Sequence, residues 1–316
     1  MHLPVSLPAA AGRDVDVVGL GQNSADLVAH ARPYPRPNTK QPLLGLERMP
    51  GGQVASALVC CARLGWRTRY IGTFGGDEAG AAGRASLIAE GVDVSAAITI
   101  AGARSRTAIV IVDDTSGERT VLWDRDERLR LGAADVPRDA VTGGRVLLVD
   151  GEDVAASAEA AAVAQSAGLV TIVDVDAVEP GIEALLAQID VLIVSEGFPE
   201  QLTGVPGTGD ALARLDELFR PALACVTLGA EGCLARCGGR EIRVPAFAVP
   251  VVDSTGAGDA FRGGFIAALL GGTRAVEDLL RRANAVAALN CRTAGARRGL
   301  PHPAEVDALV RARDRG

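Results

Sequence analysis

Short apolar runs alternate with segments of helical spacing along most of the chain. The apolar runs predict buried strands at residues 15–20, 68–73, 146–149, 170–173, 191–194 and 224–228. The helical spacing predicts helices at residues 54–64, 79–90, 154–167, 181–188, 210–219 and 260–270. Short, continuously apolar strands are typical of parallel sheets that are covered on both faces. The pattern therefore predicts an α/β fold: a three-layer, doubly wound, mostly parallel sheet.

Two segments interrupt this alternation. Residues 33–49 contain four prolines and no helical pattern. Residues 106–123 predict a hairpin, with strands at 107–112 and 119–123 and a turn at 113–117. We expect the two segments to pair as a small β lid over the strand ends, the alternative being two unrelated surface excursions. Without a repeat or linker, residues 1–316 are predicted to form one domain with this lid inserted.

A glycine-rich turn, residues 253–259 with the sequence DSTGAGD, leads directly into a predicted helix. Backbone amides at a helix N-terminus lack intrahelical partners and attract phosphate oxygens. Asp259 would repel those phosphates, so its placement favours a general base that takes a proton from an attacking hydroxyl. A helix-capping role explains Asp259 equally well at this point.

A second glycine pair, Gly51-Gly52, precedes another predicted helix and permits close backbone approach to a ligand. Asp26 lies beyond the first predicted strand, at the sheet edge where open α/β folds bind ligands. Asp174 and Asp176 follow a later strand, where they would contact sugar hydroxyls or cap the next helix. Only three histidines are present, which leaves carboxylates as the available bases.

Five segments in order, namely residues 51–52, 63–65, 72–77 (GTFGGD), 227–232 and 253–259, resemble the ribokinase-like PfkB carbohydrate kinase family over nearly the whole chain. The resemblance is nearest in type to ketohexokinase-like and sulfofructose-kinase-like sugar kinases. It implies transfer of the γ-phosphate of ATP, with Mg²⁺, to a primary hydroxyl of a small carbohydrate such as a ketohexose or related furanose.

The same resemblance assigns roles to individual residues. Asp259 matches the catalytic base, and Gly256, Ala257 and Gly258 match the anion hole. The positions that match the sugar-binding side are Asp26, Gly51, Gly52 and Ser56. The positions that match the nucleotide side are Ser195, Thr227, Gly229, Gly232, Gly258 and Asn284.

The chain departs from the family pattern at three places. Ser195-Glu196-Gly197-Phe198 replaces the Asn-x-x-Glu motif that organises magnesium, so Glu196 would act through water or the phosphates would hold the ion. Ser24 and Ser56 stand where many members have asparagine, which disfavours ribose.

Basic residues near the predicted lid are candidates for substrate choice. Lys40 in the proline-rich segment, and Arg106 and Arg125 on the hairpin arms, would contact an anionic substituent of a substrate, or would simply be solvated. Arg297-Arg298 is interpreted as a solvated basic face. The resemblance also implies K⁺ beside the anion hole, held by Asp253, Thr255 and carbonyls near Arg292 and Gly295.

The formal net charge of -7 and the aromatic content of 3% argue against nucleic acid as a partner. The apolar runs are too short to span a bilayer, so we expect a cytoplasmic protein that does not bind membranes. Exposed lid strands predict a homodimer. A nucleoside kinase and a non-catalytic sugar or nucleotide sensor are the alternatives. A dinucleotide oxidoreductase lacks its motif, because Gly19-Leu20-Gly21 is followed by Gln22-Asn23-Ser24.

Overall fold

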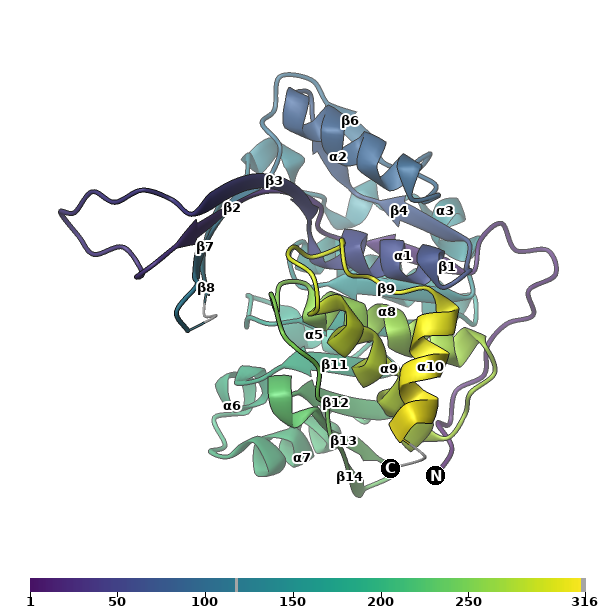
Figure 1. The fold of residues 1–316 in the computed structure, drawn as a ribbon. Coiled ribbons are helices and arrows are strands. Elements are labelled where there is room, and N and C mark those ends of the chain that lie inside the picture. Colours follow the sequence, from purple (N-terminus) through teal and green to yellow (C-terminus); the bar gives the residue numbers. More distant parts are fainter. Residues whose placement is uncertain (117–118, 314–316) are drawn as a thin grey trace.

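The computed structural model describes residues 1–116 and 119–313, and its main feature is an eight-stranded sheet (Figure 1). The strand order is β14-β13-β12-β11-β10-β9-β1-β4. In chain order the strands are β1 (Val17–Leu20), β4 (Thr68–Ile71), β9 (Val146–Asp150), β10 (Val170–Val175), β11 (Val191–Ser195), β12 (Leu223–Thr227), β13 (Cys233–Cys237) and β14 (Arg240–Val244). The pairings from β4 to β12 are parallel, and β13 and β14 add an antiparallel edge.

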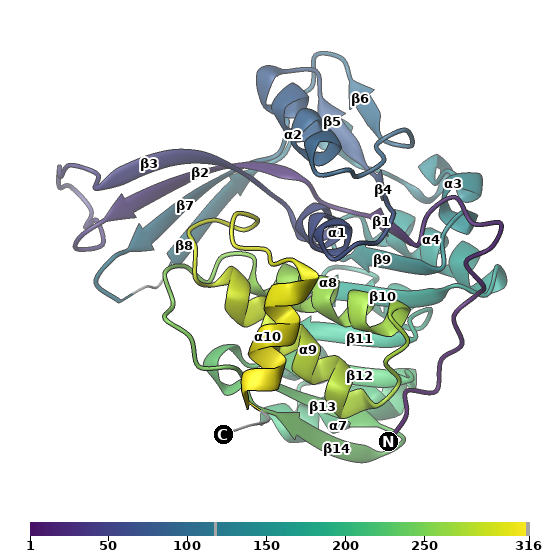
Figure 2. The ribbon, with the colours of Figure 1, turned by 45° about the vertical axis from the view of Figure 1, so that its right-hand side comes forward.

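Helices cover both faces of this sheet, as Figures 1 and 2 show. One face carries α1 (Gln53–Arg63), α8 (Ala257–Leu270), α9 (Val276–Asn290) and α10 (Pro303–Arg313). The other carries α3 (Arg138–Thr142), α4 (Val154–Ser166), α5 (Ile182–Leu186), α6 (Phe198–Thr203) and α7 (Thr208–Phe219). Successive side chains of a strand point to opposite faces of the sheet and belong to different hydrophobic cores. Val17 packs under α1 and α8, and Val18 packs under α4. Burial on both faces explains the continuous apolar runs.

A separate four-stranded sheet projects from the main body (Figure 1). Its order is β3 (Gly45–Gly51), β2 (Ser24–Ala31), β7 (Thr107–Asp113) and β8 (Arg119–Asp124). The two segments expected to pair with each other do share this sheet, but direct pairing was wrong. β2, which the sequence did not predict, lies between them, antiparallel to β3 and parallel to β7. The predicted turn at 113–117 lies partly outside the described residues.

The other predicted elements are confirmed with small shifts at their ends. The strand expected at residues 68–73 is divided, because the chain turns at Gly72 between β4 and a short β5 (Thr73–Gly75). β5 pairs with β6 (Ile98–Ile100) beside α2 (Glu78–Ala89). The sequence missed β13 and β14. Within the described part of the chain, no helix is both long and apolar enough to cross a membrane.

Candidate active site

A cleft of about 540 Å³ lies between the small sheet and the carboxyl ends of the main strands. The small sheet contributes Asp26, Ala108, Val110, Val121 and Trp123 to its lining. The main body contributes Gly52, Gly151, Asp176, Gly256 and Asp259. The carboxyl ends of parallel strands are where open α/β folds bind their ligands. Two of the predicted groups, the sugar-side carboxylate and the candidate base, therefore face one cavity.

Asp259 lies in the first turn of α8, on the cleft side. The helix begins after Gly256, which has φ 73° and could not carry a side chain there, since a Cβ would lie 2.6 Å from the Ala296 carbonyl oxygen. Burial raises the pKa of Asp259 to about 7, although Arg262 and Arg297 oppose the shift. A carboxyl group with this pKa can accept a proton near neutral pH.

Asp26 projects from β2, and its carboxylate lies beside Gly51. Ser24 donates a hydrogen bond of 2.6 Å from Oγ to Asp26 Oδ1. Gly51 pairs with Ser24 across β2 and β3, and a Cβ on Gly51 would lie 2.0 Å from Asp26 Oδ2. Burial raises the pKa of Asp26, while Ser24, Arg106 and Arg297 oppose this shift. A glycine is therefore required beside this carboxylate.

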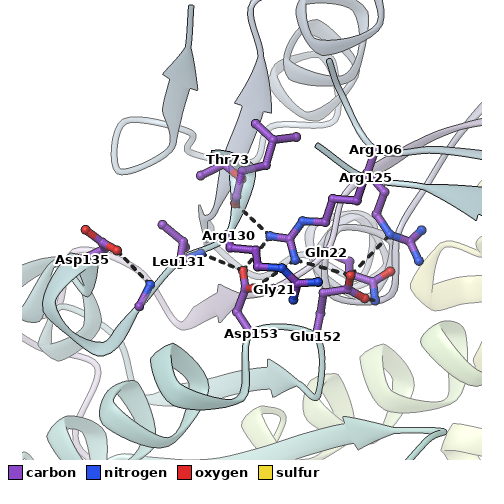
Figure 3. Close-up of polar contacts among 12 residues, drawn as sticks. Gly21, Gln22, Thr73, Arg106, Arg125, Arg130, Leu131, Asp135, Glu152 and Asp153 are labelled. Atoms are coloured by element: carbon purple, nitrogen blue, oxygen red, sulfur yellow. Dashed lines mark hydrogen bonds and ion pairs between the residues drawn. The ribbon is translucent and has the colours of Figure 1, made fainter. Parts of the chain in front are cut away.

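Glu152 and Gln22, which the sequence analysis did not select, meet Arg106 at the end of the cleft near β8 (Figure 3). Gln22 Nε2 donates to Glu152 Oε2, and Arg106 Nε lies 3.8 Å from Glu152 Oε1. The Arg106 guanidinium stacks 4.9 Å from the centre of a Trp123 ring. Asp150, at the end of β9, accepts bonds from the backbone amides of Gln22 and Glu152. Glu152 could have been selected from the sequence, because it follows a predicted parallel strand at the edge of the sheet where ligands bind.

Arg125 is a buried structural cation in this structure rather than an open anion contact. Its guanidinium donates to both carboxylate oxygens of Asp153, at 2.9 and 2.7 Å, and to Glu152 at 3.3 Å. A bidentate pair of this kind is geometrically specific. The pair fixes the segment after β8 against the loop after β9. Arg106 and Arg119, by contrast, line the cleft.

A buried ion pair joins β10 to α8, the helix that carries Asp259. Arg262 Nη2 lies 2.8 Å from Asp174 Oδ1, and it also donates to the Ile193 carbonyl oxygen at 2.9 Å. Both side chains are almost fully buried, with exposures of 2% and 1%. The two expectations for Asp174, a sugar contact or a helix cap, were therefore wrong. Its neighbour Asp176 does line the cleft.

Two of the predicted nucleotide positions lie at the ends of adjacent strands, outside the lining of the cleft. Ser195 and Thr227 end β11 and β12 and stand side by side in register. Gly229 follows in an exposed turn, whereas Gly232 packs tightly, because a Cβ there would lie 2.1 Å from the Val244 carbonyl oxygen. Asn284 on α9 is buried.

The Asn284 side chain donates to the Val244 carbonyl oxygen at 3.1 Å, so it stabilises the turn into the segment after β14. The Asn284 amide therefore points inward, toward the backbone of Val244 and Pro245.

The structure contradicts the expectations for Ser56 and Arg297, and it leaves Lys40 in solvent, which was one of the two alternatives for that residue. Lys40 lies exposed in the loop between β2 and β3 and does not line the cleft. Ser56 is fully buried in α1 and accepts a hydrogen bond from Arg297. Arg297 itself is 5% exposed, so its assignment to a solvated face was wrong, although its neighbour Arg298 is exposed. The sequence of two adjacent arginines does not indicate which of the two side chains is buried.

The predicted metal positions separate into two kinds. Glu196 and Arg292 are exposed, and Phe198, at the position of the motif's glutamate, is fully buried. The carboxylate of Asp253 accepts backbone hydrogen bonds of 2.8 Å from Thr255 and Gly295. These bonds fix the anion loop, residues 253–258, to the segment after α9. Among the described residues, no three His, Cys, Asp or Glu side chains cluster as metal ligands.

Known proteins show extensive similarity to this chain. The family model described as pfkB family carbohydrate kinase matches residues 13–303. Fructokinase-1 of Oryza sativa subsp. japonica is 31% identical over 83% of this chain and 88% of its own. A nucleoside kinase of Methanothermobacter thermautotrophicus is 26% identical over 92% and 94%. The structure of Arabidopsis thaliana ribokinase complexed with ribose and ATP superimposes with a TM-score of 0.79, at 23% identity, covering 94% of this chain and 98% of that one.

Proposed function

Because the chain belongs to the pfkB family of carbohydrate kinases, we propose that it transfers the γ-phosphate of ATP to a primary hydroxyl of a small carbohydrate, a ketohexose or related furanose. The observation that carries this proposal is Asp259, which faces the same cleft as Asp26 from the N-terminus of α8. A base at an anion-binding helix terminus suits phosphoryl transfer, in which positioning and charge stabilisation supply most of the catalysis.

In the proposed reaction, Asp26 and the backbone of Gly51 and Gly52 hold sugar hydroxyls. Asp259 accepts the proton of the attacking hydroxyl, and the amides of residues 256–258 stabilise charge on the transferred group. Arg106 and Glu152 contact the far end of the sugar. Arg119 donates a hydrogen bond of 2.8 Å to Ser254, which joins the small sheet to the anion loop. This contact supports a lid that excludes water from the cleft.

The nucleotide would lie beyond the cleft, near Ser195, Thr227 and Gly229. The magnesium ion of MgATP would neutralise phosphate charge. The chain offers it Glu196 through water, and the phosphates supply the main ligands, as is usual for this ion. This fits the exposure of Glu196 and the absence of a carboxylate cluster in the part of the chain that the structure describes.

The anion loop also fits a monovalent cation such as K⁺. Thr255 Oγ1 and Asn290 Oδ1 are buried oxygens without a hydrogen-bond partner among the described residues. The two residues adjoin, because Asn290 Nδ2 donates to the Thr255 carbonyl oxygen at 3.2 Å. Buried oxygens without partners are costly, so a cation between them would stabilise the loop.

A nucleoside kinase is the second candidate, and one observation favours it. Trp123, Val121, Val110 and Ala108 form an apolar wall of the cleft, which suits a planar base better than a sugar hydroxyl. The low aromatic content of the chain, 3%, argues against this candidate.

An ADP-release panel tests both candidates. Ketohexoses, pentoses, sugar acids, phosphosugars and nucleosides are each offered with MgATP, in KCl or in choline chloride. We expect turnover of a neutral ketose and faster turnover in KCl. If nucleosides were phosphorylated faster than sugars, the second candidate would be correct. If no compound of the panel gave ADP release, a non-catalytic sensor would be favoured.

We also propose that the chain forms a homodimer through the small sheet. Leu46, Ile109 and Leu122 are exposed, and the strand registers place Ile109 opposite Leu122 on the outer face of the sheet. Sedimentation equilibrium should give twice the 32.4 kDa chain mass, and Leu122→Lys should shift the protein to monomer. A monomeric wild type at micromolar concentration would contradict the proposal.

A further inference from the structure

One buried arginine, Arg297, lies where the sugar-binding and anion-binding loops meet. Its Nε donates to Ser56 Oγ at 3.1 Å, and its Nη2 donates to the Gly51 carbonyl oxygen. Its Nη1 is buried and has no hydrogen-bond partner among the described residues. Its own carbonyl oxygen accepts a bond of 2.9 Å from Arg63, so both ends of this residue are fixed to α1.

The contacts of residues 296 and 297 reach both halves of the site. Gly51, which Arg297 holds, packs against the Asp26 carboxylate. Ala296 packs against Gly256, whose missing side chain would otherwise overlap its backbone. The segment after α9 therefore touches the sugar side through Arg297 and the anion loop through Ala296. A displacement here would move Asp26 and Asp259 relative to each other.

Among the described residues, no carboxylate accepts a hydrogen bond from the guanidinium group of Arg297. A buried guanidinium without such a partner is costly, and burial lowers the pKa of Arg297 to about 10. The carboxylates of Asp259 and Asp26 stabilise its charge, and Arg297 in turn lowers the pKa of each. The charged and titratable groups that influence Asp259 are Arg262, Arg297, Asp176, Asp26, Asp174 and Cys60.

We propose that Arg297 is a positioning residue of the kinase. Its guanidinium group holds the backbone at Gly51 through hydrogen bonds, and its positive charge stabilises the negative charges of both Asp26 and Asp259. This inference rests on the proposed function, because it takes Asp259 as the base. It assigns Ser56 to orienting Arg297 instead of binding sugar. Arginine suits this role because its planar fork makes two bonds in fixed directions, which lysine cannot do.

Three variants separate the effect of the charge of Arg297 from the effect of its hydrogen bonds. We expect Arg297→Met to lower kcat/KM for the sugar by about 100-fold, the effect of displacing a positioning group. The midpoint of its kcat/KM against pH curve should move above the wild-type value, because a cation that favours the charged base is lost. Arg297→Lys keeps the cation, so its midpoint should stay near wild type while kcat/KM remains low. Ser56→Ala removes one bond and should cost less than either.

The matched control is Arg298→Met, which removes the neighbouring exposed arginine that pairs with Glu47. An exposed pair contributes little, so its kinetics should match wild type. A wild-type midpoint in active Arg297→Met would show a structural role alone and overturn the proposal. If Arg297→Met does not fold, wild-type kcat/KM in Arg297→Lys overturns it instead. A wild type that phosphorylates nothing in the panel refutes the proposed function, a separate outcome.

Discussion

Asp259→Asn is expected to lower kcat by about 100- to 10,000-fold, the range that a general base contributes. Asparagine has nearly the same shape but cannot accept the proton of the attacking hydroxyl. Binding of ATP should persist, because the amides of residues 256–258 remain in place. Initial rates of ADP release give kcat, and isothermal titration calorimetry gives the affinity for nucleotide.

The control for this variant is Asp210→Asn, because Asp210 occupies the corresponding third position of α7 and is exposed. A carboxylate in the first helical turn stabilises any helix by about 0.3–1 kcal/mol, so both variants lose that contribution. Only Asp259→Asn should lose turnover. If the two variants retained equal activity, the helix-cap interpretation of Asp259 would be correct.

The pH dependence gives an independent measure of the same group. Burial raises the pKa of Asp259 to about 7, and only its deprotonated form can accept a proton. The kcat/KM of the wild type should therefore rise as pH increases through about 7 and level off above it. A curve that is flat between pH 5 and 9 would indicate a base that is ionised throughout this range, as a carboxyl group with an ordinary pKa of about 4 would be.

The elements nearest the chemistry could be predicted because their signals are local. The Gly256–Asp259 turn and the Gly51-Gly52 pair each join a glycine to the start of a helix, and short sequence windows contain this information. The main parallel strands were equally clear, since burial on both faces makes their residues uniformly apolar.

β2 could not be found in the same way. Its sequence, SADLVAHA, mixes small, polar and apolar residues, because one face of the small sheet lines the cleft and the other is partly exposed. Without β2 the lid was assembled with the wrong neighbours. The pairing of Ser24 with Gly51, which brings Asp26 close to Gly51, depends on β2 and so could not be predicted either.

The buried arginines illustrate a different limit. Arg297 and Ser56 are 241 residues apart in the chain, and their contact depends on how α1 and the segment after α9 pack. Likewise, Arg262 follows the DSTGAGD motif by three positions, but its partner Asp174 comes from β10. Sequence spacing carries no signal for either pairing, so Arg297 was assigned to solvent by the average behaviour of arginine.

Arg262→Met is expected to lower the free energy of unfolding by about 3–5 kcal/mol, because removing one partner leaves the other buried without compensation. Asp174 would then depend on protonation, because burial raises the pKa of its carboxyl group above the ordinary value. The loop beside Asp259 should also loosen, since a Cβ on Gly258 would lie 2.5 Å from Arg262 Nη1, which shows how closely the guanidinium supports that turn. Urea unfolding measures the change in stability, and kcat measures the loosening.

The control is Arg214→Met, which removes an exposed arginine paired with Glu217 on α7 and should cost no more than about 1 kcal/mol. The double variant Arg262→Met, Asp174→Leu replaces both charges with apolar groups, which often restores stability. Recovery of stability without recovery of kcat would separate the two functions of the pair: burial of a neutralised charge, and support of the anion loop. A double variant as unstable as the sum of its single changes would mean that the two charges are not coupled.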